Sequence, residues 1–170
     1  IVYINPDGRR IFYQLNQSTL IYESLAPYGS YSTITFSGGF YVLTLKDRST
    51  LTFNGSGWLT QMKDRNNNLV TLSYNGNNLT NIVLPNSRAI TLTYNTDNRI
   101  ETVIDPAGNY TSITYTNGVL TDLAKPGGWA WQFTYKPGTP SGVNLIATAV
   151  NPLPDTTTYG YDTGNRVITV

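Results

Sequence analysis

The sequence contains neither cysteine nor histidine, and these two absences exclude several classes of chemistry. Without cysteine, the chain has no disulfide framework and no thiolate zinc site. Without histidine, it lacks the commonest general base and metal ligand, so a Ser-His-Asp triad and an HExxH zinc site are impossible. Charged residues are also scarce, at 12% of the 170 residues, about half the usual share. The 11 basic and 10 acidic residues leave a formal charge of +1, which argues against binding to a nucleic-acid backbone.

Long apolar runs are missing as well. Residues 24–45 and 137–154 carry no charge and are long enough to suggest a membrane span. Both segments are interrupted by glycine or proline and neither is continuously apolar, so we expect no membrane span. The first residues are Ile1, Val2 and Tyr3, and no basic segment of a signal peptide is visible.

Threonine (25), asparagine (18), glycine (15) and tyrosine (13) are abundant, a composition typical of strands and tight turns. Aromatic residues recur at steps of 21, 20, 21, 20 and 26, namely at Phe53, Tyr74, Tyr94, Tyr115, Tyr135 and Tyr161. Two residues before each of the first five stands a second large apolar residue: Leu51, Leu72, Leu92, Ile113 and Phe133. A fixed step kept by two separate columns indicates an internal repeat.

Each repeat is predicted to form two strands. In the first strand, Leu92 and Tyr94 face one way while Thr91 and Thr93 face the other, which is the period of a β-strand. The dipeptides Asn75-Gly76 and Asn117-Gly118 favour hairpin turns. The second strand carries an apolar pair three residues apart, as in Leu59 and Met62, Leu79 and Ile82, or Ile100 and Val103. Residues three apart do not share a face on a flat strand, so the pattern predicts a β-bulge or a sharp bend.

The repeats end in a turn that is clearest at Asp105, Pro106 and Gly108. Residues 1–48 are interpreted as degenerate hairpins, and residues 49–170 as about six repeats of 20–26 residues, the last incomplete. One unit cannot bury enough apolar surface to fold alone, so neighbouring units must stabilise one another. The prediction is an all-β, antiparallel repeat protein forming one continuous domain.

The sequence resembles the RHS, or YD-repeat, family. The segment from Tyr159 to Val167, Tyr-Gly-Tyr-Asp-Thr-Gly-Asn-Arg-Val, is the closest copy of the repeat pattern, and residues 105–109 match its turn. The resemblance is good over residues 49–170 and loose over residues 1–48. Leu84 and Asn151 depart from it, because they replace the aspartate that usually begins the turn.

The resemblance implies a long antiparallel sheet of hairpins that spirals into a β-solenoid or shell. In bacterial RHS proteins and insecticidal toxin complexes such strips enclose a toxic polypeptide, and in teneurins a similar barrel belongs to a cell-surface adhesion receptor. The expected role is therefore structural, in a secreted or cell-surface protein. Expected partners are further repeats of the same chain, other copies end to end, an enclosed toxin or a surface glycan, with no nucleic acid and no cofactor.

Three tryptophans are the candidate ligand-binding residues, namely Trp58, Trp129 and Trp131. Trp129 and Trp131 share a strand face with Phe133 and Tyr135, and burial in a core is the favoured alternative for them. Trp58 is expected in a turn and partly exposed. A binding module built on the tryptophan-rich fifth repeat and its loop at residues 136–142 is the rival function, and a self-assembling filament is the third. No catalytic residue and no metal site is predicted.

Overall fold

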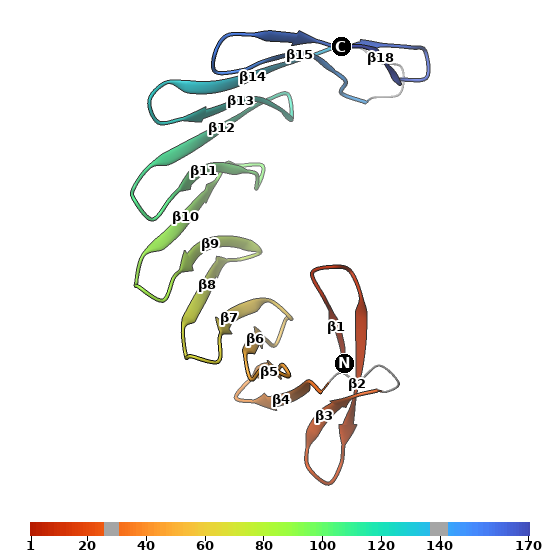
Figure 1. Cartoon of the computed structure of the whole chain (residues 1–170), viewed down its shortest axis with the longest axis vertical. Helices are drawn as coiled ribbons and strands as arrows, with labels where there is room; N and C mark the ends of the chain where they lie inside the picture. The colour runs from red at the N-terminus through yellow and green to blue at the C-terminus, as the bar shows by residue number, and fades with distance from the viewer. Residues whose placement is uncertain (26–30, 137–142) are drawn as a thin grey trace. The chain divides into compact units, whose positions relative to one another are not determined.

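The computed structural model describes residues 1–25, 31–136 and 143–170, and its regular elements there are strands without any helix. The all-β prediction is therefore confirmed for these residues. The chain forms two compact units, Ile1–Ala89 and Ile90–Val170. Figure 1 shows the strands of each unit following one another as hairpins.

The first unit contains β1 (Val2–Ile4), β2 (Arg10–Asn16), β3 (Ile21–Ser24), β4 (Thr33–Ser37), β5 (Phe40–Thr44), β6 (Thr50–Asn54), β7 (Leu59–Lys63), β8 (Leu69–Asn75) and β9 (Asn78–Val83). The second contains β10 (Ala89–Tyr94, which starts on the last residue of the first unit), β11 (Ile100–Ile104), β12 (Tyr110–Thr116), β13 (Val119–Lys125), β14 (Trp129–Tyr135), β15 (Ile146–Val150), β16 (Thr156–Thr158), β17 (Gly160–Tyr161) and β18 (Val167–Thr169).

Strand order follows sequence order throughout the described residues. Strands β1 to β16 form one antiparallel sheet in which each strand pairs with its predecessor and its successor, and β17 pairs with β18 in a separate two-stranded sheet. This order follows from the short turns, because a turn of a few residues can only join neighbouring antiparallel strands. The 16-stranded sheet is open, since its first and last strands each have a single neighbour.

A β-bulge recurs at the same place in six hairpins of the described chain. In the β6–β7 hairpin, Phe53 pairs with Leu59 but Thr52 pairs with Gln61, which leaves Thr60 as the extra residue. The extra residue shifts the alternation by one position. Leu59 and Met62, three apart in sequence, therefore reach the same face, and the predicted bulge is confirmed.

The two columns of large apolar residues lie on one face of the sheet, because directly paired residues share a face. Leu51 pairs with Met62 and Leu72 with Ile82, while Leu92 pairs with Val103 and Ile113 with Leu123. The column residues are half-buried rather than fully buried: Phe53, Tyr74, Tyr94, Tyr115, Tyr135, Tyr161, Leu51, Leu72, Leu92, Ile113 and Phe133. Among the described residues, these column residues contribute to a core only where another strand packs over them.

Such packing occurs in the first unit. Its buried apolar residues are Tyr13, Ile34 and Leu43, and half-buried side chains such as Tyr3 and Phe53 pack against them. The rings of Tyr3 and Phe53 meet edge to face with centroids 6.1 Å apart. The Tyr13 hydroxyl and the Ser32 hydroxyl are hydrogen-bonded at 2.7 Å, so this buried polar pair is satisfied.

Candidate functional site

The most regular polar contact of the described chain joins neighbouring repeats. The hydroxyl of Tyr74 donates to the carbonyl of Leu59 at 2.8 Å, Tyr135 to Leu120 at 2.7 Å, and Tyr161 to Ile146 at 3.0 Å. Each acceptor is the residue just before the extra residue of the bulge, where the strand ladder is disrupted. Each tyrosine therefore ties its own repeat to the bulge of the preceding one. Burial raises the pKa of the Tyr74 and Tyr135 phenols above the usual 10.0.

The turn predicted at Asp105, Pro106 and Gly108 is present. Asp105 N–H donates to the carbonyl of Asn109 (2.8 Å), and Gly108 N–H donates to the carbonyl of Asp105 (3.0 Å). The Asp105 carboxylate also accepts from the N–H groups of Ala107 (2.7 Å) and Asn109 (3.0 Å). Gly108 has a φ of 87°, a left-handed conformation that glycine adopts without steric cost.

The same five-residue turn recurs, often with an aspartate or asparagine at its first position. Asp64, Asn95 and Asp162 each accept two backbone hydrogen bonds through the side chain, as Asp105 does. Asn151, noted as a departure from the family pattern, makes the same pair of bonds, to Leu153 and Asp155. The carboxylates of Asp64, Asp105 and Asp162 thus accept hydrogen bonds within turns.

These hydrogen bonds lower the pKa of turn carboxyls. For Asp64 the strongest cause is the hydrogen bond from the Asn68 side chain, followed by the Asn68 N–H. For Asp162 the strongest cause is the N–H of Arg166, whose guanidinium also pairs with the carboxylate at 2.8 Å. A lowered pKa keeps these groups ionised at neutral pH, which is the opposite of what a general acid requires.

The three candidate tryptophans are exposed, and each unit holds part of the set. Trp58 lies in the turn at residues 54–58 of the first unit, is 39% exposed, and has its ring centroid 5.3 Å from that of Tyr74. Trp129 and Trp131, on β14 of the second unit, are 53% and 40% exposed. The prediction for Trp58 is confirmed, whereas burial of the other two in a core was wrong.

The exposure of Trp129 and Trp131 has a simple cause in the strand register. On one side of β14, Trp131 pairs with Leu123 and Trp129 with Lys125. On the other side, β15 pairs only with residues 132–135, so neither tryptophan has a partner there. The loop predicted to accompany them falls largely on residues 137–142, which lie outside the described residues.

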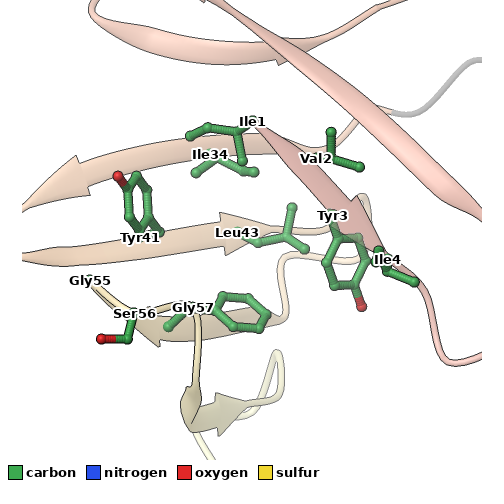
Figure 2. Close-up of a pocket in the computed structure, with 11 residues that line it drawn as sticks. Ile1, Val2, Tyr3, Ile4, Ile34, Tyr41, Leu43, Gly55, Ser56 and Gly57 are labelled. Carbon is green, nitrogen blue, oxygen red and sulfur yellow. The ribbon is translucent and has the colours of Figure 1, made fainter.

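A cavity of about 500 Å³ lies in the first unit. Figure 2 shows residues of β1 on one side of it and residues of β4 and β5 on the other. Its lining includes Ile1, Tyr3, Ile34, Leu43 and Phe53, together with the turn from Gly55 to Gly57. It is lined by no acidic or basic side chain, and burial raises the pKa of the Tyr3 phenol, so the cavity suits apolar packing rather than acid–base chemistry.

Reactive groups are dispersed over the part of the chain that the structure describes. No three carboxylates come together there in a group that could hold a metal ion. Within the same residues, no helix has the length and apolarity to cross a membrane.

Charge is divided unevenly between the two units, a feature that whole-chain composition conceals. The first unit has seven basic and four acidic residues, a net charge of +3, and the second has four basic and six acidic residues, a net charge of −2. Together these give the overall charge of +1 that argued against binding to a nucleic-acid backbone. Counting charge separately for each part of the sequence would have revealed the asymmetry.

Comparison with known proteins identifies no relative: no protein-family model and no curated protein matches this chain.

Proposed function

We propose that this chain is a structural repeat segment of the RHS or YD type, belonging to a secreted or cell-surface protein. In this proposal the strip of hairpins forms part of a β-solenoid, a shell or an adhesive array. Further repeats, or other copies end to end, would continue it, and an enclosed polypeptide or a surface glycan would be its partner.

One observation carries the structural role, namely that the same device fastens three repeats to the repeat before each of them, through Tyr74, Tyr135 and Tyr161. A bulge opens the ladder in one hairpin, and a tyrosine hydroxyl of the following repeat binds the carbonyl beside it. Such nearest-neighbour bonding is what a quasi-one-dimensional scaffold needs, because each unit contacts only the next. The carboxylates of Asp64, Asp105 and Asp162 meanwhile accept hydrogen bonds within turns. These carboxylates therefore stabilise the repeat itself, which suits a scaffold.

The test is an in-register deletion within the second unit. Removing residues 95–115 deletes one whole repeat and places Tyr94 where Tyr115 was, so the shortened chain should keep its β-sheet circular dichroism and its protease resistance. As a control, removing residues 105–115 joins β11 to the turn after β12 and reverses the strand direction, so this variant should unfold. Equal tolerance or equal damage in both variants would contradict the scaffold proposal.

The exposed tryptophans favour a second candidate, a binding module. Trp129 and Trp131 project from the same face of β14, and aromatic faces are well suited to stack on sugars or to anchor a peptide. A glycan and peptide array would test this directly. Specific binding that disappears in Trp129→Ala/Trp131→Ala, but survives in Trp58→Ala, would support the binding module. Retention of that binding in the double variant would exclude it.

A further inference from the structure

Five basic residues of the first unit lie along one side of its sheet, the side where every second turn joins the ends of two strands. In a meander of hairpins, successive turns lie alternately at the two edges. The turns at residues 45–49, 64–68 and 84–88 are every second turn along the chain. They therefore lie on the same side of the sheet, at the ends of its strands, and we call this side an edge. They contain Lys46, Arg48, Arg65 and Arg88, and Lys63 precedes the middle turn; all five are exposed. We call this set the basic edge.

The acidic residues of these turns are held in bonds of their own. Asp47 accepts hydrogen bonds from the N–H (3.0 Å) and the hydroxyl (2.6 Å) of Ser49. Asp64 accepts from the N–H groups of Asn66 and Asn68 and from the Asn68 side chain. The lowered pKa of Asp47 arises first from the Ser49 hydroxyl and also from the charge of Arg65, which belongs to the next turn along the edge.

A shallow groove of about 250 Å³ lies at the same edge and is bordered by all three turns. Ser49 comes from the first turn, Asn68 from the second and Pro85 from the third. The groove is mostly apolar, with Leu51 and Met62 in its lining, and its polar lining residues include Lys63, Asp64 and Asn68. A mostly aliphatic groove with a few polar groups suits the C–H face of a sugar ring, while the exposed cations of the basic edge suit acidic groups on that ring.

From this juxtaposition we propose that the basic edge, with its groove, binds an acidic polysaccharide such as a sulfated or uronic-acid polymer. Turns at one edge are separated by two strands, about 9–10 Å. This repeat distance is close to the length of a disaccharide, so one cationic turn meets each acidic disaccharide as the polymer runs along the edge. The ring between two charged groups occupies the groove.

The groove favours a polysaccharide over other polyanions. Single-stranded nucleic acids are bound through aromatic side chains on which bases stack, whereas none of the described residues that line this groove is aromatic. Lys46 does lie over the ring of Tyr31 at 4.8 Å, but that tyrosine is not part of the groove lining. A globular protein partner needs a broad surface of about 800 Å² per side, whereas the basic edge is a narrow line.

The test measures binding of the 170-residue chain to a heparin octasaccharide, with neutral dextran and oligo(dT) as comparison probes. The variant Arg48→Gln/Arg65→Gln removes two charges from the basic edge. The matched control Arg10→Gln/Lys125→Gln removes two exposed charges from elsewhere, so both variants carry the same net charge. Both must retain the β-sheet circular dichroism of the parent chain.

We expect salt-sensitive binding to heparin that weakens on the order of tenfold in the basic-edge variant and about twofold or less in the control. NMR amide shifts caused by heparin should concentrate in the turns at residues 45–49, 64–68 and 84–88. The proposal is overturned if heparin does not bind, or if both variants lose affinity equally, which would reveal a dependence on net charge alone. It is also overturned if oligo(dT) binds as tightly through the same residues.

Discussion

The two compact units obey the same local rules but bury very different amounts of apolar surface. Among its described residues, the first unit contains three buried apolar residues, one of which, Leu43, is 0% exposed. Among the described residues of the second unit none reaches that class, and its apolar columns stay half-buried. Both units share the bulged hairpin, the tyrosine-to-carbonyl bond and the five-residue turn.

The difference shows that the repeat and the core have separate physical causes. The repeat generates a single-layered strip, in which each strand is stabilised by its neighbours. Among the described residues, a core of buried side chains is found only in the first unit, where the less regular residues around Tyr3, Tyr13 and Ile34 pack over the face of the strip. Substitutions in the core and substitutions in the repeat should therefore have different consequences in the two units.

The largest expected effect is at the centre of the buried cluster. Leu43→Ala should lower the free energy of unfolding by about 2–5 kcal/mol, because it leaves a cavity in a fully buried site. Leu92→Ala, at a half-buried column position of the second unit, should cost about 1–2 kcal/mol. Urea unfolding combined with residue-resolved amide exchange measures both. A cost at Leu92 as great as that at Leu43 would mean that the second unit is packed as tightly as the first.

A smaller effect, of opposite sign in the two units, is expected at the fourth position of the turn. Ser87 in the first unit has a φ of 63°, and Gly108 in the second has a φ of 87°, with no atom within 4 Å of the place a Cβ would take. Ser87→Gly should stabilise by about 0.5–1 kcal/mol and Gly108→Ala should destabilise by about 1–2 kcal/mol, since left-handed backbone is costly for residues with a Cβ. Thermal melts of both variants test this, and changes of the same sign would refute it.

An effect of about 1 kcal/mol, equal in the two units, is expected from removing one tyrosine hydroxyl. Tyr74→Phe and Tyr135→Phe each delete the bond to the preceding repeat and retain the ring. The raised phenol pKa means that stability is fully present below the unfolded value near 10 and is lost as pH rises through the folded value. Unfolding curves at neutral and alkaline pH should show a weaker alkaline loss in both variants. A loss confined to one unit would contradict a shared fastening device.

The smallest effect at neutral pH is expected at the first turn position. Asp64→Asn keeps a side-chain oxygen for the two backbone N–H groups, as Asn95 already does in the second unit. Because the folded pKa of Asp64 is lowered, its contribution is present above the unfolded pKa and is lost as pH falls through the folded one. The stability of the Asp64→Asn variant should therefore be less sensitive to acid, and the stability of Asn95→Asp should be more sensitive to acid. Acid titrations followed by circular dichroism decide, and unchanged acid midpoints would be the contrary result.

Much of the local structure was predictable because its causes are local. The strand alternation at Leu92 and Tyr94, the turn at Asp105 and the bulge implied by Leu59 and Met62 all depend on residues close in sequence. The exposure of Trp129 and Trp131 was not predictable in this way. It depends on where β15 ends, which residue periodicity does not reveal.

The sequence by itself therefore determined the all-β class, the repeat of about twenty residues, the bulges and the turns, because backbone sterics and side-chain alternation act over a few residues. Tertiary structure alone decided which residues are buried and which charges become neighbours. Leu43 is buried because strands distant in sequence cover it, and Arg48, Arg65 and Arg88 share an edge because alternate turns of a meander meet there. Burial and charge clustering depend on proximity in space, and only the pairing of the strands creates that proximity.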